Sequence, residues 1–281
     1  FDWGPLGEAD ENTSDFKVAD WAAKEIQKKH DQPFFLAAGI FRPHIPWFVP
    51  KKYFDLYPLE DIFLPEIQEN DLDDTHGHDR RDWHKWVLDH NQWPQALQSY
   101  LASITYSDAQ IGRLIEGLDR SGHAEDTIII LWSDHGMHLG EKENWEKFTL
   151  WEESTRVPFL IVAPGVTRPG GRSTRPVSLL DIYPTLVELA KRPQLEQTDG
   201  HSLVPLLRDP AAETLTELFH RLPLMRRVLL ISVHGWFAQS GLLGKPDTGG
   251  QVFYILDQAR ALEKQLKRLW TDAGVKIKPE I

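Results

Sequence analysis

The chain has 281 residues, and its 42 acidic and 31 basic side chains give a net charge of −11 at pH 7. This acidic balance argues against nucleic acid or an anionic membrane as a partner, and no apolar run approaches the ~18 residues of a membrane-spanning helix. The chain contains no cysteine, so disulfides, thiolate metal sites and cysteine nucleophiles are excluded within these residues. This length allows one large α/β domain or two smaller ones.

The amino-terminal part is expected to form a helix followed by a strand. Thr13, Ser14 and Asp15 are candidate capping residues. The apolar residues that follow at helical spacing are Phe16, Ala19, Ala23 and Ile26. Gln32-Pro33 ends that pattern, and the apolar run Phe34 to Ile40 has the length of a buried strand.

The turn after this run carries His44 between Pro43 and Pro46. The two prolines restrict the backbone and therefore fix the direction of the histidine. On local grounds a structural loop histidine and a functional histidine are equally supported.

Residues 50–94 are expected to form a long surface excursion, because prolines and charged residues interrupt any periodic pattern. The segment contains four histidines, His76, His78, His84 and His90. A metal site is one interpretation of this cluster, and a solvated insertion near a substrate opening is the favoured one.

The central motif is a strand that ends in polar residues. After a long amphipathic helix over residues 97–118, the apolar run Thr127 to Trp132 predicts a buried parallel strand, which stops at Ser133-Asp-His-Gly136. Open α/β sheets bind ligands at the carboxyl ends of their strands. Asp134 and His135 are therefore candidate metal ligands, with Lys147 as a nearby positive charge; an ordinary hydrogen-bonded turn is the alternative.

The remaining elements of the first 210 residues alternate in the same way. Val157 to Ala163 predicts a second buried strand, a loop rich in Gly, Pro and Arg covers residues 165–176, and a helix spans Leu179 to Leu189 with Pro184 in its first turns. This alternation favours an α/β fold with a mostly parallel sheet and helices on both faces.

Four motifs in this order resemble the sulfatases of the alkaline-phosphatase superfamily, most closely the iduronate-2-sulfatase type. They are the run Phe35 to Pro46 with its Pro-His-Ile-Pro turn, Ser133 to Gly136, Trp145 to Lys147 with Arg156 to Pro158, and Leu180 to Leu186. The resemblance covers about residues 13–209 and implies the carboxyl half of a sulfatase core, that is, a partial alkaline-phosphatase-like sheet.

The resemblance also implies site roles. Asp134 and His135 would bind a divalent metal, calcium in this family, while Lys147 and His44 would contact the sulfate or the leaving-group oxygen. The substrate class would be a sulfated sugar or a similar sulfate ester. A sulfatase would be periplasmic or secreted, with any signal segment upstream of Phe1.

Two parts of the sulfatase site have no counterpart in the sequence. The family's formylglycine nucleophile comes from a Cys-x-Pro-x-Arg motif, and neither this motif nor a Ser variant of it occurs. The family's amino-terminal aspartate pair is also missing. Since a hard divalent cation takes six or more oxygen ligands, Asp134 and His135 alone cannot hold it. The isolated chain is therefore expected not to hydrolyse sulfate esters.

The last quarter of the chain follows a different pattern: a strand at residues 227–233, a glycine-rich turn, and a helix from Val252 to Leu269. The runs His234 to Gln239 and Pro246 to Val252 resemble the opening of the catalytic unit of sucrose synthase and related retaining glycosyltransferases, over about residues 217–281. By this resemblance His234, Gly249, Gly250 and Gln251 would contact a nucleotide sugar. A plain tight turn is the alternative on spacing alone.

The expected organisation is a partial sulfatase domain at 1–210 and a glycosyltransferase fragment at 211–281. Three interpretations stay open: a sulfuric ester hydrolase fragment, a UDP-sugar glycosyltransferase fragment, and a non-functional fused open reading frame. The sequence predicts neither the oligomeric state nor the sulfated substrate.

Overall fold

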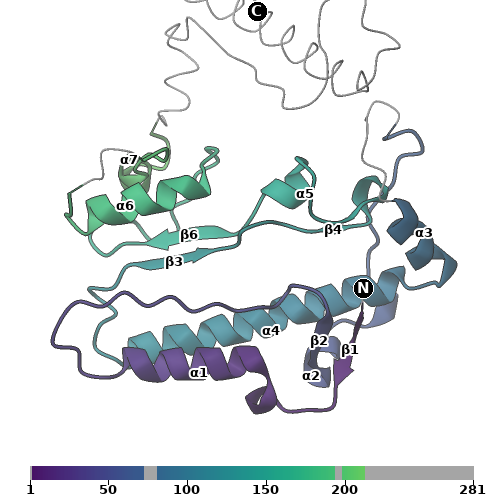
Figure 1. Cartoon of the computed structure of the whole chain (residues 1–281), viewed down its shortest axis with the longest axis horizontal. Coiled ribbons are helices and arrows are strands. Elements are labelled where there is room, and N and C mark those ends of the chain that lie inside the picture. Colours follow the sequence, from purple (N-terminus) through teal and green to yellow (C-terminus); the bar gives the residue numbers. More distant parts are fainter. Residues whose placement is uncertain (1, 73–80, 194–197, 213–281) are drawn as a thin grey trace, which may run out of the picture. The chain divides into compact units, whose positions relative to one another are not determined.

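The computed structural model describes residues 2–72, 81–193 and 198–212 (Figure 1). The contacts divide the chain after Pro164 into two units, and each is described by itself. His76, His78 and the nucleotide-sugar candidates His234, Gly249, Gly250 and Gln251 lie outside the described residues, as does the expected strand–turn–helix unit.

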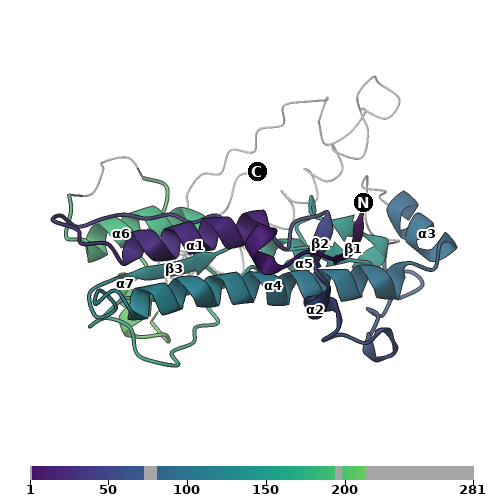
Figure 2. The same cartoon turned by 90° about the horizontal axis from the view of Figure 1, so that it is seen from below.

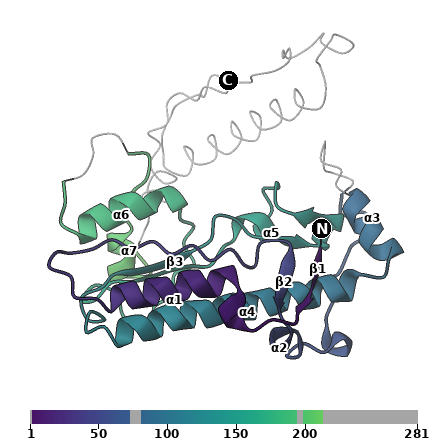
Figure 3. The ribbon, with the colours of Figure 1, turned by 60° about the horizontal axis from the view of Figure 1, so that its bottom comes forward.

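Two long helices dominate the first unit. The helices are α1 (Ser14–Ile26), α2 (Lys51–Phe54), α3 (Arg81–Asp89), α4 (Trp93–Asp119) and α5 (Glu152–Thr155), with 3-10 turns η1 (Asp10–Asn12), η2 (Leu59–Asp61) and η3 (Glu141–Glu143). Helices α1 and α4 lie side by side (Figures 2 and 3). They approach closely because Gly117 faces Ala23: a Cβ at residue 117 would lie 2.8 Å from the Ala23 Cβ. Both helices were predicted from their apolar spacing, and both are confirmed.

The strands form three small pairs. Strand β1 (Trp3–Leu6) runs parallel to β2 (Trp47–Pro50). Strand β3 (Ile129–Trp132) runs antiparallel to β6 (Phe159–Val162), and β4 (His138–Leu139) runs antiparallel to β5 (Trp145–Glu146). The α/β character agrees with the prediction from sequence.

The orientation and burial predicted for the central strand were wrong. Strand β3 pairs antiparallel with β6 and was expected to be parallel. Its first three residues are half-buried and Trp132 is exposed, whereas β6 alternates between half-buried and exposed residues. Trp132 retains 49% of its exposed area. A continuous apolar run indicates that both faces can be buried, but it does not specify the direction of the neighbouring strand or whether a covering layer is present.

The run Phe34 to Ile40 has no regular secondary structure, although a strand was predicted there. A strand needs a neighbour whose N–H and C=O groups complete its ladder. Among the residues that the structure describes, none pairs with this run. The prediction failed because strand propensity is local whereas pairing is not.

The expected surface excursion at 50–94 is described except for residues 73–80, and part of it reaches the core. Helix α3 lies in this segment and buries Val87 and His84, which are 0% and 5% exposed. Val87 belongs to one core cluster with Trp47, Trp93 and Trp145, and a second cluster joins α2 to the middle of α4 through residues such as Tyr53 and Tyr106. The predicted surface excursion thus also contributes two buried side chains from α3, whose other described side chains are exposed.

The described part of the second unit is a short helical arrangement: η4 (Leu179–Asp181), α6 (Ile182–Leu189) and α7 (Val204–Arg208). Buried Asp181 accepts hydrogen bonds from the backbone N–H groups of Ser178 at 2.9 Å and His201 at 2.8 Å. One carboxylate therefore caps the start of the helix and also holds the later segment at His201 against it.

Candidate functional site

Three segments that are far apart in the sequence meet in the first unit. His44 lies on the turn before β2, Asp134 and His135 directly follow β3, and Lys147 directly follows β5. The Lys147 Nζ lies 2.7 Å from the His135 Nε2 and 3.3 Å from the His44 Nε2. The structure therefore brings together all four residues that the sequence predicted for the sulfatase site.

The hydrogen bonds define the tautomer of both histidines. Each Nδ1 lies 2.7 Å from a backbone carbonyl oxygen, that of Ile45 for His44 and that of Gly136 for His135. A carbonyl oxygen only accepts, so each Nδ1 carries the proton and each Nε2 presents a lone pair. The Lys147 ammonium donates to both lone pairs, so the two imidazoles together bind one positive charge.

The backbone around Lys147 is strained. Its two neighbours, Glu146 and Phe148, adopt left-handed φ values of 70° and 80°. For residues with a Cβ this conformation costs about 1 kcal/mol each, and such strain concentrates where a side chain must be held in one direction. The strain supports a positioning requirement at Lys147.

The close packing of residue 136 against α5 explains why the Asp-His turn ends in glycine. Its N–H donates to the Ser154 carbonyl at 2.8 Å, and a Cβ at this position would lie 2.0 Å from the Glu153 carbonyl oxygen. Only glycine fits between the turn and α5. The turn is further held by the Ser133 hydroxyl, which donates to the His135 carbonyl at 2.9 Å. The direction of His135 thus depends on this close backbone approach.

The turn that carries His44 is anchored by Asp15. The buried Asp15 carboxylate accepts the N–H groups of Phe41 and Arg42, both at 3.0 Å. The Arg42 guanidinium donates in turn to the Phe48 carbonyl. Burial lowers the pKa of Arg42, and the charge of Asp15 partly offsets this effect. Sequence reasoning assigned Asp15 only a capping role, and an Asp at a helix start gives no signal of this longer-range contact.

A second network, which the sequence did not reveal, supports the segment that carries Lys147. Fully buried His138 bonds through Nε2 to the Thr149 hydroxyl at 2.8 Å, and that hydroxyl donates to the Ser154 hydroxyl at 2.9 Å. Burial lowers the pKa of His138 and therefore favours the neutral ring. These bonds tie Thr149, two residues after Lys147, to β4 and α5.

Asp134 and His135 do not by themselves make a calcium site. The Asp134 Oδ2 lies 3.7 Å from the His135 Nε2, and the Asp134 side chain is 75% exposed. Over the described ranges there is no group of three or more His, Asp or Glu side chains that could hold a metal ion. Calcium takes six to eight oxygen ligands, whereas this pair offers one carboxylate and a softer nitrogen.

No helix in the described part of the chain has both the length and the apolar character needed to cross a membrane. Across the sequence, two family models match. The model described as sulfatase matches residues 3–192, and the model described as the first GT-B domain of sucrose synthase matches residues 213–281.

Curated relatives show the same division. A sulfatase of Formosa agariphila is 39% identical over 214 residues, which cover 74% of this chain and 42% of that protein. Iduronate 2-sulfatase of Homo sapiens is 33% identical over 59% of this chain and 37% of its own length. Sucrose synthase of Acidithiobacillus caldus is 49% identical over 79 residues, which cover 28% of this chain and 10% of that enzyme. The chain thus spans well under half the length of these relatives.

The fold comparison agrees. A phosphonate monoester hydrolase from Silicibacter pomeroyi superposes with a TM-score of 0.66 at 26% identity, covering 74% of this chain and 44% of that one. The alkaline-phosphatase-like α/β fold expected from the motifs is therefore confirmed. The chain belongs to the sulfatase family, and it carries a sucrose synthase GT-B segment at residues 213–281.

Proposed function

We propose that residues 1–210 form one part of a sulfuric ester hydrolase site that acts on a sulfated sugar or a similar sulfate ester. The observation that carries this proposal is the convergence of Lys147 with His44 and His135, at 3.3 Å and 2.7 Å. These residues come from three separate segments, and a strained backbone surrounds the lysine. Human iduronate 2-sulfatase, whose name specifies a sulfated sugar acid, supports this substrate class.

The proposed roles follow from charge. The Lys147 ammonium neutralises negative charge on the sulfuryl oxygens, and it exchanges its hydrogen bonds to the two imidazoles for contacts with these oxygens. His44 protonates the departing alkoxide as an imidazolium, because only a protonated Nε2 can donate. Asp134 and His135 contribute two ligands to a divalent metal, with calcium as the expected ion.

We also propose that this chain alone does not hydrolyse sulfate esters. Sulfatases typically use a metal ion and a formylglycine. This sequence contains no cysteine from which formylglycine could form, and its metal pair is incomplete. A sulfatase containing this part is proposed to be periplasmic or secreted, with no nucleic-acid partner.

The test separates binding from turnover. Isothermal titration of the full chain with inorganic sulfate is expected to show weak binding that Lys147→Met lowers about tenfold, the effect of losing one charge-assisted contact of about 1.4 kcal/mol. Lys147→Arg keeps the charge and is the matched control. Equal sulfate affinity for Lys147→Met and the unaltered chain would refute the assignment of the site. Hydrolysis of 4-nitrophenyl sulfate that disappears in Asp134→Ala would instead refute the proposed inactivity.

A second candidate function rests on the match of residues 213–281 to the first GT-B domain of sucrose synthase. We propose His234, Gly249, Gly250 and Gln251 as contacts to a UDP-sugar, in a segment that matches 10% of the length of a sucrose synthase. Saturation-transfer NMR with UDP tests this: signal transfer that Gly250→Val abolishes supports it, and no transfer refutes it.

The junction of the two segments, near residues 210–217, allows a third reading, in which two neighbouring reading frames have been joined without a combined function. Independent long DNA reads across codons 200–225 test it. One uninterrupted frame in those reads would refute the joined-frame reading.

A further inference from the structure

An exposed aromatic ring lies directly beside His44. The centroids of the Phe41 and His44 rings are 5.0 Å apart, and the two ring planes are tilted by 42° to each other. The Phe41 side chain keeps 51% of its area exposed. The site that contains His44 and Lys147 therefore has an apolar side as well as a charged one.

The turn restrains the position of the Phe41 ring. The Phe41 N–H donates to the Asp15 carboxylate at 3.0 Å, and the Phe41 carbonyl accepts the His44 N–H at 3.0 Å. The guanidinium carbon of Arg42 lies 5.1 Å from the centre of the Phe41 ring, and the same guanidinium donates to the Phe48 carbonyl. A ring that is already ordered loses little conformational freedom when a ligand packs against it.

The contacts of His44 give the site a direction. In the described part of the chain the ring contacts of His44 are to Phe41 and, at 6.3 Å, to His135. Lys147 bridges His44 and His135, so the charge proposed to face the sulfuryl oxygens lies toward His135. Phe41 instead contacts the histidine that is proposed to protonate the leaving-group oxygen. The alcohol part of the ester, which is bonded to that oxygen, is therefore expected on the Phe41 side.

We propose that Phe41 is a specificity-determining residue that selects sulfate esters whose ester oxygen is carried by a ring carbon. A ring attached directly to that oxygen, as in a sugar or an aryl sulfate, presents a flat face to Phe41 while the oxygen stays within reach of His44. The negative face of the phenyl ring attracts the polarised C–H bonds of such a ring, whereas an open chain has no face to match it. This inference deepens the proposed function and rests on it, because it uses the role of His44 proposed there.

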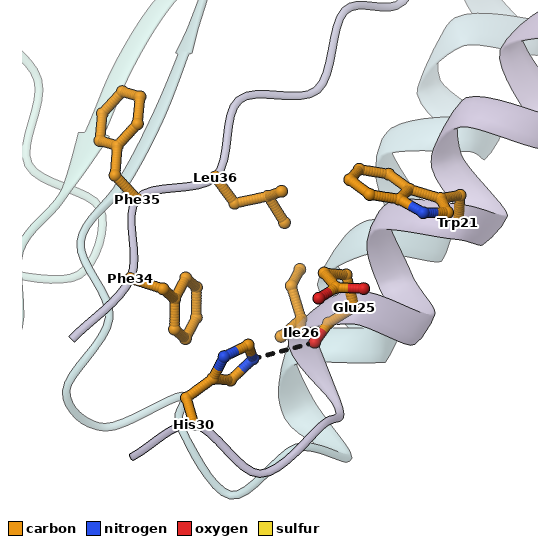
Figure 4. A pocket seen from close by; sticks show the side chains of 7 residues that line it. All are labelled: Trp21, Glu25, Ile26, His30, Phe34, Phe35 and Leu36. Carbon is orange, nitrogen blue, oxygen red and sulfur yellow. Dashed lines mark hydrogen bonds between the residues drawn. The ribbon is translucent and has the colours of Figure 1, made fainter. Parts of the chain in front are cut away.

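An apolar ligand has a competing place to bind in the same unit. An open groove of about 320 Å³ lies between α1 and the segment before the His44 turn, and its lining includes Trp21, His30 and Phe35 (Figure 4). The Phe35 side chain is 82% exposed, and in Figure 4 its ring points away from α1. Phe35→Leu removes an aromatic ring from this groove and leaves the ring contacts of His44 intact, so it is the matched control for Phe41→Leu.

The test measures how tightly the full 281-residue chain binds inorganic sulfate, n-hexyl sulfate, cyclohexyl sulfate and phenyl sulfate. The hexyl and cyclohexyl esters have the same number of carbon atoms and differ in the ring. Dissociation constants come from saturation-transfer NMR titrations. The unaltered chain is expected to bind cyclohexyl sulfate about fivefold more tightly than n-hexyl sulfate. Tighter binding of phenyl sulfate than of cyclohexyl sulfate assigns an aryl ring as the preferred leaving group, and the reverse order assigns a saturated, sugar-like ring.

The variants of Phe41 separate the ring from apolar surface in general. Phe41→Leu and Phe41→Met keep an apolar side chain without a flat ring, and both are expected to lose the preference for cyclohexyl sulfate while binding inorganic sulfate as before. Phe41→Tyr keeps the ring and is expected to keep the preference. Phe35→Leu is also expected to keep it.

A preference for cyclohexyl sulfate that survives in both Phe41→Leu and Phe41→Met would overturn the proposal. So would a preference that Phe35→Leu abolishes, because the ligand would then occupy the groove, and so would equal affinities of the unaltered chain for the two six-carbon esters. In these cases the proposed sulfate site still stands if Lys147→Met lowers the affinity for inorganic sulfate. If Lys147→Met leaves that affinity unchanged, the proposed function fails, and the role of Phe41 fails with it.

Discussion

Asp15 is predicted to hold the His44 turn in place, and Asp15→Ala tests this. The carboxylate is 4% exposed and accepts two backbone N–H groups at 3.0 Å each. Removing it deprives two part-buried backbone donors of their acceptor, so a loss of roughly 2 kcal/mol in the free energy of unfolding is expected, about 1 kcal/mol for each hydrogen bond. The loss should be concentrated in the turn that carries His44.

The assay is urea denaturation combined with hydrogen exchange of the Phe41 and Arg42 amides. Asp20→Ala is the matched control, because Asp20 lies on the same helix and makes only a surface ion pair with Lys24. Such pairs contribute about 0.5 kcal/mol. If the two variants lose the same stability, or if the two amides exchange no faster in Asp15→Ala, the assignment of Asp15 as an anchor is wrong.

Three further predictions concern the site and its support. Gly136→Ala should lower the midpoint of thermal unfolding, because its Cβ would lie 2.0 Å from the Glu153 carbonyl, and an unchanged midpoint would contradict this close approach. Trp145→Phe should cost about 1–3 kcal/mol in urea denaturation, since it deprives the buried Nδ1 of His84 of its donor at 3.2 Å. Burial lowers the pKa of His84 and of His138 below the unfolded value of about 6.5. The neutral rings therefore stabilise the fold fully above pH 6.5, and this stability is lost as the pH falls below that value. The difference between urea midpoints at pH 7.5 and 5.5 measures the loss, and it should be smaller in His138→Gln.

The sequence allowed the helices and the site residues to be predicted for different reasons. Helix α4 was predictable because its apolar residues recur over many turns, which is a local property. His44, Asp134 and Lys147 were proposed as site residues because they occur in turns within motifs that resemble those of sulfatases, and their roles stay a prediction. Their distances were not predictable, since they depend on three segments meeting.

The failures share one physical cause, which is dependence on a distant partner. The direction of β3 is set by β6, which lies 27 or more residues further along the chain. The run from Phe34 to Ile40 has the composition of a strand, but its pairing depends on residues elsewhere. Asp15 could not be recognised as an anchor because its donors, Phe41 and Arg42, lie 26 and 27 residues away.

Helix α4 has a consequence for the order of folding. Its 27 residues contribute to both core clusters and contact α1, α2, β1 and β2. A helix forms from neighbours in sequence within about a microsecond, whereas strand pairing over long separations is slow. Helix α4 can therefore form early, before α1 and the strand pairs assemble on it. Mutations that lower the helical propensity of α4 should then slow refolding more than they speed unfolding.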